Sequence, residues 1–232
     1  MTSLWLRLQA PFAAFRWMQA GVWRGTSPVI PPSAAWGLVL NLAGIETRLD
    51  VEGVTTLVRP DAPGFEVAIA DVDGAPRERG SLYQQLHTYP VGNSGEAFRA
   101  RTHGAKYWIA PVRRELLVGF DMVLGVRASD DLADRVKRGL RGELAESRYG
   151  LPFAGDNAFL FDRIDVLPEP PAARWYTPIG RDEGQRRGSC RLTIGIDRSD
   201  SSKTTSALFA PLREPVPVPP AEAWVAVPRA MS

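Results

Sequence analysis

The pattern of apolar and polar positions predicts a strand at the start of the chain. Residues 4–9 alternate apolar and polar side chains, which is typical of a strand with one buried face. A second alternating run covers residues 116–126, where six apolar side chains share one face: Leu116, Val118, Phe120, Met122, Leu124 and Val126. Further strands are predicted at residues 51–58, 65–70 and 159–166. The chain therefore contains several strands that can each bury a face.

Two helices are predicted between these strands. The first opens at a pair of prolines, with Ser33 as the expected N-cap, and ends near Gly44. The second begins after Ser129, its expected N-cap, and Gly150 is the expected stop. Its apolar residues recur every four positions, as in an amphipathic helix: Leu132, Val136, Leu140 and Leu144. The order strand, helix, strand, strand, helix, strand is that of a split β-α-β domain.

This order predicts an α+β fold, with a ferredoxin-like (RRM-like) domain over residues 1–166. Residues 167–232 differ, because prolines punctuate them and alternating runs are short, at 190–196 and 224–227. We expect them to form a small C-terminal β-rich subdomain. A chain of 232 residues should bury roughly 70% of its unfolded surface, so its core needs no disulfide.

Cysteine usage and hydropathy indicate a cytoplasmic protein without membrane contact. Cys190 is the only cysteine, which excludes an intrachain disulfide and a Cys-based metal cluster and fits a reducing compartment. Polar residues and Pro11 interrupt the first apolar run, so we expect no signal peptide. The most apolar stretch, residues 34–45, is too short to span a bilayer.

A basic segment, residues 80–110, lies between the second and third strands and has no clear periodicity. Between Arg77 and Arg114, seven Lys or Arg residues oppose two Glu residues, although the whole chain carries a net charge of only +2. Rings and histidines interleave with these cations: Tyr83, His87, Tyr89, Phe98, Arg99, Arg101, His103, Lys106, Tyr107 and Trp108. Cations for phosphates and flat rings for stacked bases are typical of single-stranded nucleic-acid binding. The alternatives are a solvated basic loop and, for Trp108, a place in the core.

A glycine-rich loop at residues 180–188 carries three further cations, Arg181, Arg186 and Arg187. Glycines let a backbone approach a phosphate closely. The loop has neither the Gly-Lys-Ser/Thr of a P-loop nor a dinucleotide fingerprint. An ordinary flexible loop is therefore the competing interpretation.

Enzymatic chemistry is a third candidate. His87 and His103 are the only histidines, and with Tyr83 and Lys106 they could supply the acid and base of metal-free RNA cleavage. Nothing in the sequence pairs a base with an orienting group, so contact residues without chemistry are the preferred interpretation. Two histidines without cysteine company also make a poor metal site. We expect no catalytic residue, no metal and no cofactor.

The N-terminal half of the chain resembles a known family. The residues that carry the resemblance are 4–16, with their Ala-Pro-Phe-Ala-Ala-Phe run, then 32–38, 83–85 and the Arg-Arg-Glu-Leu-Leu of 113–117. They are similar to the CRISPR-associated RAMP superfamily and, within it, to the "Cas-five" family of type I Cascade-like effector complexes. The DevS-like (Myxococcus-type) branch is the most similar, and the resemblance covers most of residues 1–166.

The resemblance implies a RAMP domain with an inserted basic thumb hairpin at about residues 80–112. It implies a non-catalytic subunit that binds and caps the 5′ handle of the CRISPR RNA and contacts the backbone RAMP subunit and the large subunit. The target DNA, near the protospacer-adjacent motif, would be an indirect partner. The complex would serve antiviral defence or transposon-associated DNA targeting. The RNA-binding residues that it implies are Arg16, Trp17, Arg24, Gln84, Gln85, His87, Arg99, Arg101, His103, Lys106, Arg113, Arg114, Arg186 and Arg187.

One branch of this family cleaves precursor CRISPR RNA. Lys106 is followed by Tyr107 here, whereas that branch has an adjacent Lys-His pair. A metal-independent endoribonuclease that processes precursor RNA is therefore the alternative to the non-catalytic subunit.

Overall fold

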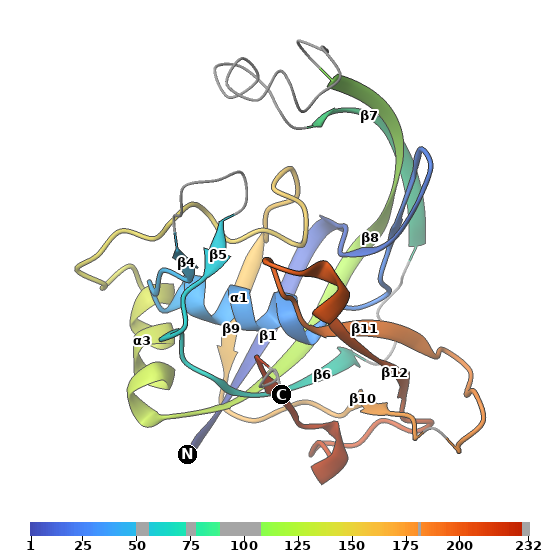
Figure 1. Ribbon diagram of the computed structural model, residues 1–232. Helices are drawn as coiled ribbons and strands as arrows, with labels where there is room; N and C mark the ends of the chain where they lie inside the picture. Colours follow the sequence, from blue (N-terminus) through green and yellow to red (C-terminus); the bar gives the residue numbers. More distant parts are fainter. Residues whose placement is uncertain (50–55, 73–77, 89–107, 181, 229–232) are drawn as a thin grey trace.

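The computed structural model describes residues 1–49, 56–72, 78–88, 108–180 and 182–228, with the backbone alone at 86–88, 108–110 and 201. Within these residues the fold is mixed α+β, with one large sheet and two α-helices (Figure 1). No helix in the described part of the chain combines the length and the apolar character needed to cross a membrane.

The centre of the sheet is built on the predicted first and third strands. β1 (Thr2–Ala13) pairs antiparallel with β8 (Trp108–Ala128) on one side and with β9 (Arg163–Leu167) on the other. β6 (Phe65–Val72) pairs antiparallel with β8, so the central order is β6-β8-β1-β9. Leu4, Leu6 and Leu8 are buried along β1, which confirms the predicted alternation.

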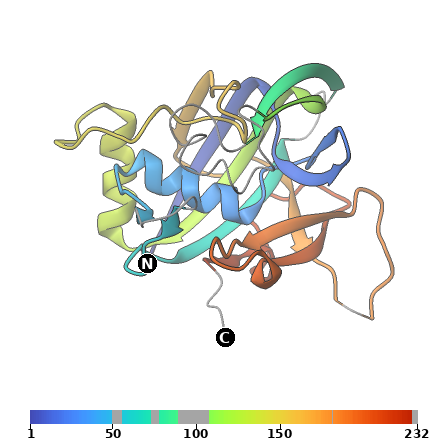
Figure 2. The same ribbon diagram turned by 45° about the horizontal axis from the view of Figure 1, so that its top comes forward.

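Helices α1 (Pro32–Leu42) and α3 (Asp130–Leu140) pack against each other and cover one face of the sheet (Figures 1 and 2). Their buried side chains form one core with the inward face of the central strands, including Leu6, Val39, Leu124 and Val136. This burial of both alternating strands and amphipathic helices is the main source of stability for the fold.

The helix ends differ in part from the predictions. Ser33 is not the N-cap of α1, because the chain enters the helix at Pro31 and Ser33 lies inside the first turn. Proline at the first helical position already has the required φ, so a side-chain cap is not needed to start the helix. Ser129 is confirmed as the N-cap of α3, since its Oγ accepts from the Leu132 N–H at 3.3 Å. That helix ends at Leu140, well before Gly150, and Gly142 follows it with a φ of +73°.

The C-terminal strands continue the sheet beyond β6. β10 (Ala173–Pro178) pairs with β6, β12 (Thr205–Pro211) with β10, and β11 (Cys190–Gly195) with β12. β13 (Val225–Val227) also pairs with β6, and two short 3-10 helices, η2 (Ser201–Lys203) and η3 (Ala221–Ala223), lie in the connections. The division of the chain at residue 166 into two units stays a prediction.

Three tryptophans cover the sheet face that is opposite the helices. The Trp5 ring centre lies 5.8 Å from those of Trp175 and Trp224. A Cβ at Gly125 would lie 2.6 Å from the Trp5 ring and 3.0 Å from the Trp224 ring. Glycine is therefore required at this position of β8 for the rings to pack on the strand.

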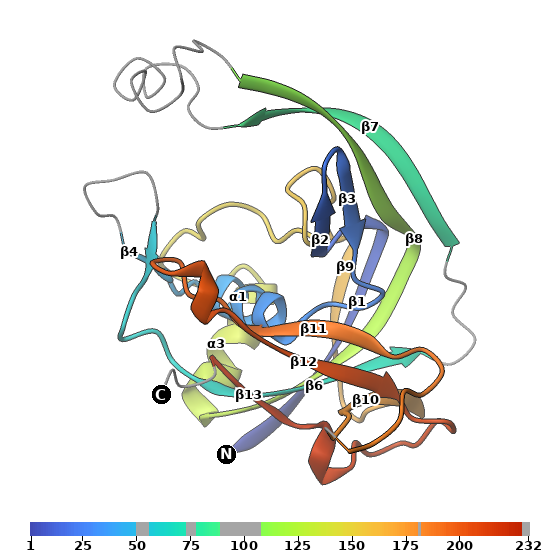
Figure 3. The same ribbon diagram turned by 45° about the vertical axis from the view of Figure 1, so that its right-hand side comes forward.

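A long hairpin leaves the sheet at its far end. β7 (Glu78–Thr88) pairs antiparallel with the first half of β8, from Glu78 opposite Val118 to Thr88 opposite Trp108. We call residues 78–88 and 108–118 the arm. In Figures 1 and 3 the arm arches over the side of the molecule that carries α1, β4 (Arg48–Leu49) and β5 (Leu57–Val58).

Residues 80–88, which show no clear periodicity in the sequence, belong to strand β7 of the arm. The described side chains of β7 are exposed or half-buried, so the apolar alternation that marks an ordinary strand is missing there. A second hairpin, β2 (Arg16–Ala20) and β3 (Trp23–Thr26), pairs with β8 at the base of the arm. The strand predicted at 51–58 is seen at Leu57–Val58, and residues 51–55 lie outside the described part.

Candidate nucleic-acid interface

One face of the arm's base exposes an aromatic ring and several polar groups. Tyr83 of β7 lies opposite Arg113 of β8, and cross-strand partners in an antiparallel pair share a face. The Arg113 Nε donates to the Ser81 Oγ at 3.2 Å, which holds the guanidinium along this face. The Tyr83 side chain is 80% exposed, and the neighbouring Gln85 is exposed as well. The base of the arm thus presents a ring and a cation to solvent.

The β2–β3 hairpin extends the same face with two indole rings. The Arg113 N–H donates to the Val22 carbonyl at 2.8 Å, and Trp23 lies beside Arg113 in the parallel β3–β8 pair. The guanidinium carbon of Arg113 is 5.4 Å from the centre of the Trp23 ring, within the range of a cation–π contact. We call Trp17, Trp23, Tyr83 and Arg113 the aromatic platform.

Gly25 is the point at which the two tryptophans converge. A Cβ on Gly25 would lie 3.4 Å from the Trp23 Nε1 and 3.5 Å from the Trp17 ring. Trp17 is nevertheless 49% exposed, so its ring is free to stack on a flat ligand. The platform therefore combines exposed ring surface with positive charge.

Glu115 attaches the hairpin to the arm, a role that the sequence did not indicate. Its Oε2 accepts from the Thr26 N–H of β3 at 2.9 Å, and its Oε1 accepts from the Arg79 Nη1 of β7 at 3.0 Å. The carboxylate is 15% exposed and links three strands. Glu115 is thus a positioning residue for the platform, because it holds β3 and β7 against β8. No sequence motif marks it, since its partners are far away in the sequence.

Arg114 points to the other face of the arm. Its Nη2 lies 2.5 Å from the Asp156 Oδ2, and its Nε donates to the Gln84 Oε1 at 3.4 Å. The two charged side chains are only 14% and 9% exposed. The geometry gives Arg114 a structural partner in the loop before β9, and its contact with RNA stays a prediction.

Of the predicted RNA-binding residues, the structure brings four together at the base of the arm: Arg16, Trp17, Arg24 and Arg113. Arg16 is exposed on β2. The Arg24 Nη1 donates to the carbonyls of Gly21 and Trp23 at 2.7 and 3.2 Å, so it closes the turn of its own hairpin. Arg16 and Arg113 are therefore the cations of this group that lie at the surface.

Other predicted residues are elsewhere or outside the described part. Arg99, Arg101, His103 and Lys106 lie outside the described residues, as does the side chain of His87. Arg186 and Arg187 lie in the loop between β10 and β11, which Figures 1 and 3 place away from the free end of the arm. Arg186 forms an ion pair with Glu183 within that loop.

Comparison with known proteins shows a family and a fold. The sequence model of a family described as "CRISPR-associated protein (Cas_Cas5)" matches residues 3–142. The fold is similar to that of a chain of a "CRISPR RNA-guided surveillance complex", with a TM-score of 0.56 and 14% identity over 96% of both chains. A "Crystal structure of Cas protein" aligns with a TM-score of 0.48 and 14% identity over 92% of this chain and 95% of that one. No curated protein matches the sequence.

Proposed function

Because this chain belongs to the CRISPR-associated protein Cas5 family, we propose that it is an RNA-binding subunit of a type I, Cascade-like, CRISPR RNA-guided surveillance complex. It binds and caps the 5′ handle of the CRISPR RNA and contacts the backbone RAMP subunit and the large subunit. The target DNA is reached indirectly, near the protospacer-adjacent motif. The observation that carries the proposal is the aromatic platform at the base of the arm.

The topology supports a ferredoxin-like RAMP domain. The central order β6-β8-β1-β9, with a helix after β1 and another after β8, is the arrangement expected of a split β-α-β domain. The arm, continued by residues 89–107, corresponds in this proposal to the thumb hairpin. We place the chain in the DevS-like branch on the resemblance of its N-terminal residues.

The platform fits a single strand better than a duplex. Exposed rings stack on unpaired bases, and each stacked base contributes about 1–3 kcal/mol to binding. Arg113 supplies a cation next to the Trp23 ring, where a phosphate of the same strand can reach it. The excess of cations between Arg77 and Arg114 supplies the longer-range attraction for a polyanion.

We propose that the subunit does not cleave RNA. Tyr83 is the one member of the possible acid–base group whose side chain is described, and it is 80% exposed with no orienting partner among the described residues. The endoribonuclease alternative is tested by incubating the protein with repeat RNA in EDTA. Discrete cleavage that His87→Ala or His103→Ala abolishes would overturn the non-catalytic role.

Binding of handle RNA to Trp17→Ala tests the platform directly. Met18 is the matched control, because it is the next residue of β2 and is 44% exposed against 49% for Trp17, but it has no ring. We expect Trp17→Ala to weaken binding about fivefold or more, the loss of one stacked base, and Met18→Ala to have little effect. Equal affinities for both variants and the wild type would count against the proposal. Equal binding of single-stranded DNA of any sequence would indicate a general single-strand binder instead.

A further inference from the structure

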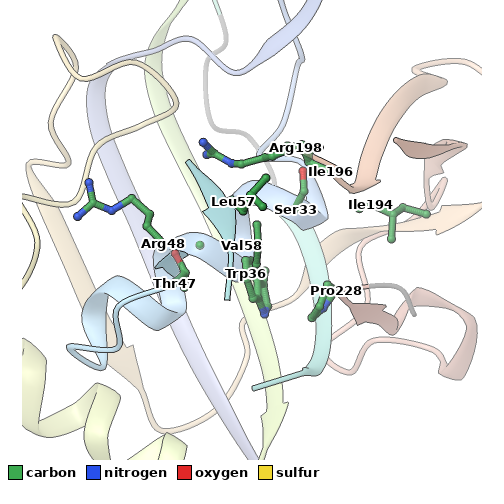
Figure 4. Close-up of a pocket in the computed structure, with 12 residues that line it drawn as sticks. Ser33, Trp36, Thr47, Arg48, Leu57, Val58, Ile194, Ile196, Arg198 and Pro228 are labelled. Carbon is green, nitrogen blue, oxygen red and sulfur yellow. The ribbon is translucent and has the colours of Figure 1, made fainter. Parts of the chain in front are cut away.

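A small pocket lies between α1, the β4–β5 hairpin and the end of β11 (Figure 4). These elements are on the side over which the arm arches (Figure 3). Its volume is about 150 Å³. Its wall is mostly apolar and includes Trp36, Leu57, Val58, Ile194, Ile196 and Pro228. An apolar cavity of about this size holds a benzene-sized ring. The pocket is therefore large enough for one flat ring and too small for a drug-sized ligand.

The rim of the pocket combines one engaged cation with one available cation. Arg48 makes a bidentate contact with Glu46, with both N–O distances below 3 Å, and its guanidinium lies over the Tyr149 ring. Arg48 lowers the pKa of Glu46 to about 2 through this hydrogen-bonded pair, so the two charges offset each other. Arg198 is exposed on the rim and forms no ion pair with any residue that the structure describes.

The carboxylate next to Arg198 is held by hydrogen bonds within its own loop. The carboxylate of the preceding Asp197 accepts from the Ser199 N–H, the Ser199 Oγ and the Asp200 N–H, at 2.6–2.9 Å. Ser33 also lines the pocket from the first turn of α1, which carries no acidic side chain. The exposed Arg198 guanidinium and the N-terminal turn of α1 are thus the groups at the rim that can contact an anion beside an apolar ring.

We propose that this pocket receives one single-ring nucleobase of a bound RNA strand, with the adjacent phosphate on Arg198. The inference rests on the proposed RNA-binding function and adds a site to it. The Trp36 Nε1 already donates to the Pro63 carbonyl at 2.9 Å, so the indole offers its ring, not its N–H, to the ligand. The hydroxyls of Ser33 and Thr47 line the same space and supply partners for the polar edge of the base.

A proline or leucine side chain of a partner protein is the competing occupant. Such a side chain would fill the apolar wall equally well, but it would leave Arg198 without an anion. A nucleotide supplies the ring and the negative charge together. The charge at the rim therefore favours the nucleotide, and the experiment below separates the two.

Gly37 allows the pocket to be filled without disturbing the core. It lies in α1 and lines the pocket, and a Cβ added to it would meet nothing within 4 Å. Gly37→Leu places a large side chain in the pocket and improves helix propensity, whereas Gly37→Ala improves propensity but leaves most of the space. We expect the thermal unfolding temperatures of both variants to equal or exceed that of the wild type. We expect Gly37→Leu to bind handle RNA about tenfold more weakly, and Gly37→Ala to bind it within about twofold of wild type.

Photo-crosslinking identifies the occupant directly. Handle RNAs that carry 4-thiouridine at one position at a time are irradiated with the full-length protein, and the crosslinked peptides are identified by mass spectrometry. We expect one RNA position to crosslink to residues 33–48, 57–58 or 190–198, and this crosslink to disappear in Gly37→Leu. Arg198→Glu should weaken RNA binding in parallel, which keeps the test valid if Gly37→Leu is poorly folded.

Three results would overturn the inference. RNA that binds normally to Gly37→Leu and Arg198→Glu, and crosslinks elsewhere, would exclude the pocket while leaving the proposed function intact. If Gly37→Leu binds RNA normally but no longer associates with the other subunits of the complex, the pocket holds a side chain of a partner protein instead. Failure of the wild-type protein to bind handle RNA would overturn the proposed function, and this inference with it.

Discussion

Arg113 and Arg114 are neighbours in β8, but their side chains lie in opposite environments. Arg113 is exposed, donates to Ser81 and lies 5.4 Å from the centre of the Trp23 ring. Arg114 is 14% exposed and is paired with Asp156. Successive side chains of a strand point to opposite faces, so one face of the arm's base meets solvent and the other meets the body. A run of basic residues is therefore not a uniform binding surface, because one cation is available to a ligand while the next holds the arm in place.

The same distinction recurs at the pocket. Arg48 is paired with Glu46 and lies over Tyr149, whereas Arg198 forms no ion pair among the described residues and the carboxylate of Asp197 is bound by Ser199 and Asp200 instead. In both places the paired arginine contributes to the structure of the site and the unpaired one contributes charge. Total cation counts overstate the charge that RNA can use.

Removal of Arg114 should have the largest effect on stability. Arg114→Ala leaves the Asp156 carboxylate, 9% exposed, without its cation, which should lower the free energy of unfolding by roughly 3 kcal/mol. Arg113→Ala should change it by about 0.5 kcal/mol or less, as is usual for exposed positions. Urea unfolding of both variants at neutral pH measures the difference.

A neutral replacement of the pair provides the control. Asp156 also accepts from the Ala158 N–H at 3.0 Å through its Oδ1, and an asparagine keeps that bond. Arg114→Met combined with Asp156→Asn should therefore recover much of the lost stability. Equal losses for Arg113→Ala and Arg114→Ala would break the distinction between the two faces.

The aromatic platform should give the next largest effect, and on RNA binding instead of folding. Trp23→Ala should weaken handle-RNA binding by about 1–3 kcal/mol, with the salt dependence unchanged. Arg113→Ala should weaken binding and also reduce the slope of log affinity against log salt by about 0.7. Fluorescence anisotropy at several salt concentrations measures both quantities.

The double variant sharpens this prediction. Because the Arg113 guanidinium contacts the Trp23 ring, the two losses should not add, and the cycle should show coupling. Arg114→Lys serves as the matched control, since it keeps a cation at a position that faces away from the platform. A larger change in salt slope for Arg114→Lys than for Arg113→Ala would contradict the assignment of the exposed face.

Much of the sheet and both helices follow from local pattern. The alternation at residues 116–126 predicts a strand because one face is buried against the helices, and Ser129 caps its helix as expected. The pattern fails in β7 because the strand has no fully buried face among its described side chains. Gly150 does not end α3, because the helix already ends at Leu140. The spacing of apolar residues in the sequence continues past Leu140, so it does not show where the helix ends.

The residue types of the candidate site could be predicted from the sequence, but their arrangement in space could not. The tryptophans and arginines near the start of the chain are visible in the sequence, but their position beside the arm depends on β3 pairing with β8 about 90 residues later. The role of Glu115 depends on the same pairing, and that of Asp156 depends on a separate contact between β8 and the loop before β9; no motif marks either residue. A pairing between distant strands is set by the whole fold, so local reasoning cannot find it.

Glu115 should give a smaller effect that separates positioning from contact. Glu115→Gln keeps an acceptor for the Thr26 N–H but loses the ion pair with the half-exposed Arg79, which should cost about 0.5–1 kcal/mol. Glu115→Ala also leaves the buried Thr26 N–H unpaired, which adds about 1 kcal/mol or more. Hydrogen exchange at the Thr26 amide reports the loss directly.

The RNA affinities of the two Glu115 variants complete the test. Glu115→Ala should weaken RNA binding because the β2–β3 hairpin is released from the arm, and Glu115→Gln, which keeps the acceptor for the Thr26 N–H, should bind at least as tightly as the wild type. Removal of a negative charge near the platform would by itself strengthen binding to RNA. Tighter RNA binding by Glu115→Ala would therefore indicate that Glu115 acts through its charge, and would contradict its role in positioning the hairpin.

The smallest effect concerns Asp197, whose arrangement leaves Arg198 available. The Ser199 hydroxyl, followed by the Asp200 N–H, lowers the pKa of the Asp197 carboxyl below its ordinary value of 3.8. A group with a lowered folded-state pKa stabilises the protein above its unfolded pKa, and that stabilisation is lost as the pH falls through the folded value. Stability should therefore decline below about pH 4, and Asp197→Asn should flatten this decline.

The amide oxygen of Asp197→Asn can accept the same three hydrogen bonds, so the variant should keep the loop and the position of Arg198 at neutral pH. Thermal unfolding from pH 3 to pH 7 measures the flattening, and an unchanged RNA affinity for Asp197→Asn at pH 7 shows that Arg198 was already free of its neighbour. A marked gain in affinity would show instead that Asp197 offsets Arg198, and the distinction between paired and available arginines would then fail at the pocket.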